Sequence, residues 1–130
     1  MARSLLCATA GQPAGYLRYD GVACAPVRAR LRLCTSRLAE HRLLRHEAGV
    51  DDRCRACGAA GETVQHVFLE CAAFDAARSA ARTALRAVAL DLDVAAIAGV
   101  APDSAADWQR AVLHDATATL TLAVRARMRL

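Results

Sequence analysis

Residues 54–71, CRACGAAGETVQHVFLEC, hold three cysteines and one histidine that together have the composition of a metal site. Zinc takes four tetrahedral ligands from thiolate sulfur and imidazole nitrogen, and a Cys-x-x-Cys turn can present two sulfurs to one ion. The spacing therefore predicts a Zn²⁺ site with the ligands Cys54, Cys57, His66 and Cys71. Four protein ligands leave no coordination position for water, so the site is expected to be structural rather than catalytic.

Two of these ligands, His66 and Cys71, are five residues apart. On a regular helix this spacing turns their side chains about 140° from one another, at about 100° per residue. They can converge on one ion only where Cys71 lies at or past the end of the helix. Thr63 is predicted to be the N-cap of that helix, which is expected over about residues 64–71, and Glu62 lies beside its positive end.

Outward from this segment the pattern is helical, and the predicted fold class is all-α: a small helical domain with a zinc-bound Cys-x-x-Cys turn between helices. One long helix is expected from Pro26 through Val27, Leu31 and Leu38 to about residue 48, where Gly49 ends it. Residues 1–25 are read as a loosely ordered lead-in. Residues 26–130 are predicted to be a single zinc-binding domain with its zinc knuckle at 54–71.

Three more segments follow the knuckle. A helix is predicted over about 74–90, a short helix or apolar turn over 91–100, and an amphipathic helix over about 105–127. The apolar side of the last helix is expected to carry Trp108, Val112, Ala116, Leu120 and Val124. Trp108 is also the centre of an alternative interpretation, in which this helix packs on a protein partner and the chain is a purely structural or interaction module.

The composition favours a domain that depends on a bound metal for its stability. The chain has 130 residues, room for one small domain and too few for a polymerase. Alanine accounts for 32 of them, whereas Leu, Val, Ile and Phe together number 29. Small domains with so little bulk often depend on a cross-link such as a metal ion.

Positive charge is concentrated in one part of the chain. Residues 26–57 contain eight arginines against four acidic residues, which accounts for the whole net charge of +4. Such a stretch can contact the phosphate backbone of RNA or DNA, although a solvated helix face is the plainer alternative. The candidate nucleic-acid-binding residues are Arg28, Arg32, Arg42, Arg45, Arg53 and Arg55.

Enzymatic activity is not expected. The sequence has no Gly-rich phosphate loop, no Gly-x-Ser-x-Gly and no His-Glu-x-x-His. A redox role for Cys54 and Cys57 would require a strand before the pair and a helix directly after it, and neither is predicted. No apolar stretch is long enough to span a membrane. The cysteine spacing fits metal binding in a reducing compartment, the nucleus or the cytoplasm, better than secreted disulfides.

The segment 54–71 resembles the C-terminal zinc-binding (CCHC) domain of non-LTR retrotransposon reverse transcriptases. Glu62-Thr63 before His66 and Val67-Phe68-Leu69 before Cys71 extend the match beyond the ligands. Upstream, Leu31-Arg32 and Ser36-Arg37-Leu38 resemble the family's Leu-Arg-Thr-Gly-His-Ser-x-Leu, with Leu33-Cys34-Thr35 in place of Thr-Gly-His. The resemblance covers about residues 28–90. It implies a tail domain or remnant without the polymerase or RNase H catalytic residues, which helps to hold RNA or target DNA.

The small number of aromatic residues favours the interaction-module alternative. Proteins that bind single strands usually stack bases on aromatic side chains. Aromatic residues make up only 4% of this chain. Binding to nucleic acid would therefore have to rest on arginine and phosphate, with little dependence on base sequence.

Overall fold

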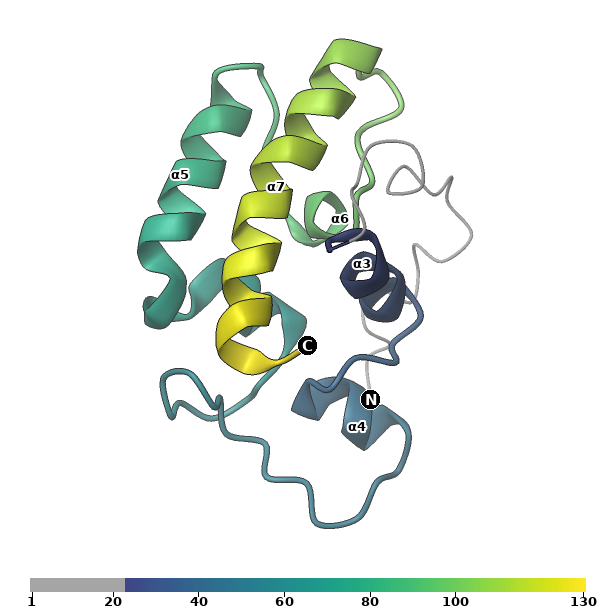
Figure 1. The fold of residues 1–130 in the computed structure, drawn as a ribbon, viewed down its shortest axis with the longest axis vertical. Coiled ribbons are helices and arrows are strands. Elements are labelled where there is room, and N and C mark those ends of the chain that lie inside the picture. The colour runs from purple at the N-terminus through teal and green to yellow at the C-terminus, as the bar shows by residue number, and fades with distance from the viewer. Residues whose placement is uncertain (1–22) are drawn as a thin grey trace.

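The computed structural model describes residues 23–130, and this part of the chain forms helices and connecting segments without a strand (Figure 1). The all-α prediction is therefore confirmed. Most of the expected lead-in, residues 1–22, lies outside the described residues. The Cys-x-x-Cys turn, residues 54–57, lies between the helix α4 (Ala39–Leu44) and the π-helix η1 (Gln65–Glu70), and is thus between helices as predicted.

Two helices dominate the fold, α5 (Asp75–Arg86) and α7 (Asp107–Met128), and they pack side by side (Figure 1). Buried residues recur on α7 at helical spacing, among them Leu113, Leu120 and Val124. Trp108 is not on this buried side, since 61% of its surface is exposed. It lies about 140° around the helix from Leu113, so its predicted place on the apolar face is wrong.

The long helix predicted over residues 26–48 is in fact two helices, α3 (Ala25–Arg32) and α4 (Ala39–Leu44). Cys34 ends the first in the left-handed conformation, with a φ of 55°. The Thr35 amide donates to the Arg30 carbonyl at 2.9 Å and the Cys34 amide to the Leu31 carbonyl at 3.2 Å. This pair of bonds is a Schellman motif, which here has no glycine to signal it. The apolar spacing continued across the break and concealed it.

The same motif ends two more helices at residues other than glycine. His46 (φ 57°) closes α4, and Ala89 (φ 59°) closes the turn after α5. Gly49, the predicted end of the long helix, lies in the segment beyond α4. These three described helix ends therefore have the motif without glycine, whereas the helix over Val94–Ile97 is followed by the same motif at Gly99 (φ 78°).

The remaining helices of residues 23–130 are short: η1 (Gln65–Glu70), the 3₁₀ turn η2 (Ala72–Phe74) and α6 (Val94–Ile97). The carboxylate of Asp93 caps α6 by accepting from the Ala96 amide at 2.7 Å. The buried apolar residues that the structure describes form two clusters. The larger one includes the ligands Cys54 and Cys71, and the smaller one lies between α5, α7 and the segment that joins them: Leu85, Leu90, Ala96, Ala101, Leu113 and Ala116.

Arg28 joins α3 to α6 and α7 from inside the protein. Its side chain is fully buried, and its guanidinium donates to the Ile97 carbonyl at 2.9 Å, the His114 carbonyl at 3.0 Å and Thr117 Oγ1 at 2.8 Å. The cation thereby satisfies a carbonyl at the negative end of α6. Arg28 cannot contact a nucleic acid from this position, and its predicted role as a phosphate ligand is wrong.

Candidate metal centre

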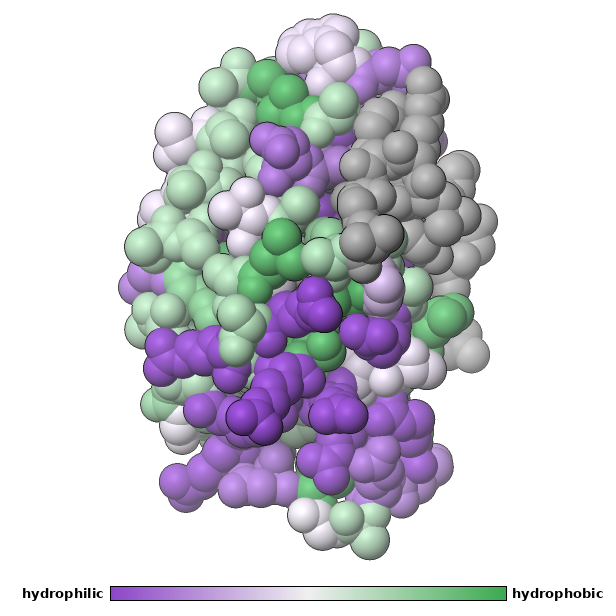
Figure 2. Space-filling model, in the orientation of Figure 1, coloured by the Kyte–Doolittle hydropathy of each residue, from purple (hydrophilic) through white to green (hydrophobic). Residues whose placement is uncertain are grey.

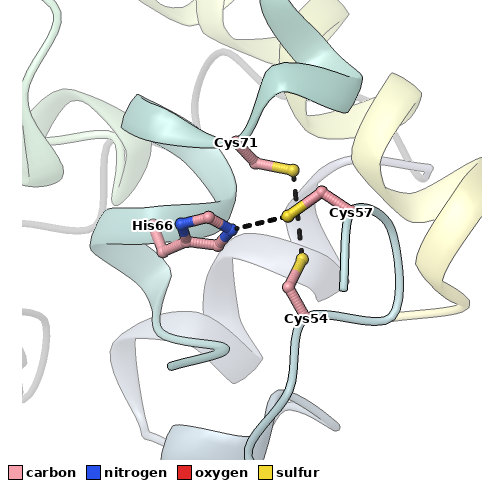
Figure 3. A group of neighbouring side chains, drawn as sticks. All are labelled: Cys54, Cys57, His66 and Cys71. Carbon is pink, nitrogen blue, oxygen red and sulfur yellow. Dashed lines mark hydrogen bonds between the residues drawn. The ribbon is translucent and has the colours of Figure 1, made fainter. Parts of the chain in front are cut away.

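The four predicted ligands converge. One ligand atom from each of Cys54, Cys57, His66 and Cys71 lies within 4.8 Å of all the others (Figure 3). Cys54 Sγ and Cys71 Sγ are 3.9 Å apart, and Cys57 Sγ is 3.2 Å from His66 Nε2. The structure thus brings together the full set that the spacing predicted.

These distances fit a tetrahedral metal. Zinc bond lengths of about 2.3 Å to sulfur and about 2.1 Å to nitrogen imply ligand separations of about 3.8 Å between two sulfurs and about 3.6 Å between sulfur and nitrogen. The two observed separations, 3.9 Å and 3.2 Å, are close to these values. The cluster could therefore hold a metal ion such as zinc.

The first two ligands are held by a tight turn. The Gly58 amide donates to the Cys54 carbonyl at 2.7 Å, and the Cys54 amide donates to the Ala59 carbonyl at 2.8 Å. Gly58 has a φ of 79°, which residues with a Cβ seldom adopt. The turn directs both sulfurs toward η1, where the other two ligands lie (Figure 3).

The second pair of ligands is brought together by the π-helix. The Cys71 amide donates to the His66 carbonyl at 2.6 Å, so the wider i→i+5 ring closes between the two ligand residues themselves. Cys71 then leaves the helix in an extended conformation. The expectation that Cys71 lies past the helix end is confirmed. Thr63 is confirmed as a cap, since its Oγ1 accepts from the His66 amide at 3.0 Å.

Glu62 and Glu40 connect the zinc knuckle to α4, because the carboxylate of each accepts a hydrogen bond from a backbone amide in the other's segment. Glu62 is 2% exposed, and its carboxylate accepts from the Ala39 amide at 3.1 Å and the Arg55 amide at 2.9 Å. Glu40 in turn accepts from the Val64 amide at 2.8 Å. Glu62 therefore caps α4 rather than η1, and Glu40 takes the place at η1 that the sequence suggested for Glu62.

The thiols differ in their readiness to ionise. A hydrogen bond from the Ala59 amide, with a further one from His66, lowers the pKa of Cys57 to about 7. Burial raises the pKa of Cys71 to about 11, although the Ala73 amide opposes this shift. Because a metal binds thiolates, its uptake must displace a proton from Cys71 at neutral pH.

The six arginines predicted to bind nucleic acid do not share one surface. Arg28 and Arg32 are buried, so Arg32 joins Arg28 as a wrong prediction. Two more of the six arginines form ion pairs with Glu47: Arg42 through Nε at 2.7 Å and Arg45 through Nη2 at 2.9 Å. The hydrogen bonds from Arg42 and Arg45 also lower the Glu47 pKa.

The last two lie beside the first metal ligand. Arg53 is exposed, and Arg55 Nη2 pairs with the buried Glu62 at 3.1 Å. Sequence reasoning instead missed a hollow of about 620 Å³ lined by Arg30, Arg37, Arg125 and Arg129. A dense Arg-x-Arg-x-Arg run over residues 125–129 was the available signal for it.

A scan against protein-family models gives no match, and searches of curated proteins and of solved structures also give none. Among the helices of residues 23–130, none combines the length and apolarity that crossing a membrane requires.

Proposed function

We propose that the Cys54, Cys57, His66 and Cys71 cluster is a structural Zn²⁺ site, and that the small helical module it stabilises binds nucleic acid without catalysing a reaction. The convergence of the four ligand atoms to within 4.8 Å of one another carries the first part of this proposal. The buried positions of Cys54 and Cys71, 2% and 0% exposed, support a role in closing the core.

Zinc would supply a cross-link among segments that have little regular structure. In small peptides such a site contributes on the order of 10 to 16 kcal/mol of apparent binding free energy. The ligands come from the Cys-x-x-Cys turn and from η1 and its end, which Glu62 and Glu40 connect to α4. A fourfold protein ligand set favours a closed site over a hydrolytic one.

The nucleic-acid part of the proposal rests on charge. Hydrophilic side chains gather over the half of the molecule that contains α4, the segment after it and the last turn of α7, whereas the alanines of α5 make the other half more apolar (Figure 2). Arg53 and Arg55 flank Cys54 there and have exposed side chains. Arginine contacts to phosphate are sensitive to salt and largely indifferent to base sequence.

We also propose that the module is related to the C-terminal zinc domain of non-LTR retrotransposon reverse transcriptases. The ligand spacing and the Glu62-Thr63 pair support this relation. Thr63 caps η1 and Glu62 holds the Arg55 amide inside the Cys-x-x-Cys turn, so both matched residues have a structural reason to accompany the ligands.

Metal analysis of purified, reduced protein tests the zinc site. We expect one equivalent of zinc, and its loss in Cys57→Ser and His66→Ala. Cys24→Ala is the matched control, because Cys24 is a buried cysteine outside the cluster. Less than half an equivalent of zinc, together with helicity that chelator does not change, would refute the site.

Binding of single-stranded RNA and DNA, followed by fluorescence anisotropy at increasing salt, tests the partner. The affinity should fall steeply as salt rises, because arginines that contact phosphates displace counterions. An affinity that stays constant from low to high salt contradicts the proposal.

The exposure of Trp108 favours a second candidate function, a protein-interaction module. A tryptophan that is 61% exposed in the first turn of α7 is typical of the residues that anchor protein interfaces. Sedimentation of the protein and of Trp108→Ala separates the two candidates. Self-association that depends on Trp108, without any binding to RNA or DNA, favours the second.

A further inference from the structure

The arginine-lined hollow between α3 and the end of α7 contains none of the four metal ligands. It has a volume of about 620 Å³. Its described lining includes no aspartate or glutamate and consists of Arg30, Thr35, Arg37, Leu122, Arg125, Ala126, Arg129 and Leu130. Four positive charges therefore surround one open space.

Two distant parts of the chain build this hollow. One wall comes from Arg30 on α3 and from the turn that follows, and the other comes from the C-terminal part of α7. Arg30 Nη2 donates to the Leu130 carbonyl at 3.3 Å, and Arg125 Nη1 donates to the Ala23 carbonyl at 3.2 Å. These bonds hold the walls together across about a hundred residues of sequence.

Three of the four charges on the hollow, those of Arg37, Arg125 and Arg129, have no acidic side chain paired with them in the described structure. Arg42 and Arg45 pair with Glu47, and Arg55 pairs with Glu62. By contrast, the hydrogen bond of Arg125 goes to the Ala23 carbonyl, which leaves its positive charge in place, and no described hydrogen bond involves the side chains of Arg37 and Arg129. Arg125 lies in the last turn of α7, and Arg129 follows the helix in a left-handed conformation, so both line the same hollow.

We propose that this hollow, with Arg30, Arg37, Arg125 and Arg129, is a binding site for phosphate groups, supplied by the backbone of a nucleic-acid strand. The identity of the strand rests on the proposed function, whereas the phosphate chemistry rests on the hollow alone. Guanidinium groups bind phosphate oxygens through two parallel hydrogen bonds, and several of them around one concave space can hold adjacent phosphates. A bound anion would remove the mutual repulsion of the four arginines.

The double variant Arg37→Ala/Arg129→Ala tests the site. No described hydrogen bond involves either side chain, so the fold should persist, and circular dichroism checks this. Arg82→Ala/Arg86→Ala on α5 removes the same charge away from the hollow and is the matched control. Each protein is titrated with a single-stranded oligonucleotide and, separately, with inorganic pyrophosphate.

We expect the hollow variant to bind the oligonucleotide at least about tenfold more weakly, since each charge-assisted hydrogen bond is worth about 1.5 to 3 kcal/mol. Its salt dependence, the slope of log K against log salt, should fall by about 1.4 for two lost contacts to a single strand. The α5 control should remain within about twofold of the wild type, because screening limits the effect of distant charge.

The outcomes separate this inference from the proposed function. If the wild type binds the oligonucleotide and the hollow variant binds it as well as the α5 control does, the phosphate site is refuted while nucleic-acid binding stands. If the wild type binds pyrophosphate through the hollow but no oligonucleotide, the phosphate site stands with free phosphates as its ligand, and the proposed function fails. Binding of neither ligand overturns both.

Discussion

The metal-cluster end of the molecule and the α5–α7 end are stabilised in different ways. The smaller core cluster, between α5 and α7, consists of leucines and alanines on or between regular helices. Around the metal cluster the helices are short, and buried polar groups such as Ser36, His41 and Glu62 lie beside the core. The α5–α7 end can therefore be held by packing, whereas the other end depends on ligands and hydrogen bonds whose partners must all be present.

Removing the metal should produce the largest difference in stability between the two ends. In His66→Ala, or in the wild type with chelator, we expect amide hydrogen exchange to accelerate over residues 50–75, because zinc binding contributes on the order of 10 kcal/mol. The amides of α5 and α7 should keep more of their protection. Mass spectrometry of the exchanging protein measures both regions at once. Equal loss of protection in the two regions would show that they form one cooperative unit.

Glu62→Ala should have the next largest effect. The substitution leaves the Ala39 and Arg55 amides without their acceptor, and we expect the free energy of unfolding to fall by about 3 kcal/mol. Denaturant titration measures this change. Glu70→Ala, at an exposed position in the same segment, is the control and should change stability by about 0.5 kcal/mol or less. Equal effects of the two substitutions would show that the hydrogen bonds of Glu62 do not stabilise the metal-cluster end.

His41 should make the metal-cluster end sensitive to pH. Burial, assisted by the nearby Arg45, lowers the pKa of His41 from 6.5 to about 4. The neutral imidazole is thus favoured by the fold, and its contribution is complete above pH 6.5 and is lost as the pH falls toward 4. Between pH 8 and pH 5 this amounts to about 2 kcal/mol.

The comparison with His41→Gln isolates that contribution. Both proteins contain the same metal ligands, so only His41 distinguishes the pH dependence of their unfolding free energies. The wild-type curve should fall more steeply with decreasing pH, by about one proton near pH 5. Parallel curves would mean that His41 does not stay neutral in the folded protein.

Ala89→Gly, at the α5–α7 end, should give the smallest change and the opposite sign. Ala89 has a φ of 59° at the Schellman motif that follows α5. Glycine adopts this conformation without the steric cost of a Cβ, and we expect the free energy of unfolding to rise by about 0.5 kcal/mol. Thermal unfolding measures it, with Ala87→Gly, at a right-handed position in the same turn, as the destabilising control. A loss of stability in Ala89→Gly would contradict the assignment.

The sequence predicted the ligand set because four residues of one chemistry at a fixed spacing constrain a metal site locally. It also predicted most helices, since their apolar spacing is regular. It could not predict the break at Cys34, because a Schellman motif without glycine leaves no mark in the residue pattern. The burial of Arg28 was equally hidden, since its acceptors at Ile97 and His114 lie about 70 to 86 residues further along the chain.

The arginine-lined hollow could not be predicted from the sequence either, because its residues are far apart along the chain. Arg30 and Arg37 lie in the basic segment, but Arg125 and Arg129 come from a part of the sequence where acidic residues balance the charge overall. Only the folded chain brings the four together. The local composition therefore pointed to a basic segment in which Arg28 and Arg32 are buried, and it did not point to Arg125 and Arg129.

The hydrogen bond from the Cys71 amide to the His66 carbonyl has an evolutionary consequence. Because this bond fixes the ring size between two ligands, the loss or gain of one residue between them would rotate Cys71 away from the metal by about 100°. Ala60, between the Cys-x-x-Cys turn and η1, is exposed and makes no described hydrogen bond, so one residue can be lost or gained there more easily. Diverging copies of this module should therefore vary in length before the histidine and keep the interval after it unchanged.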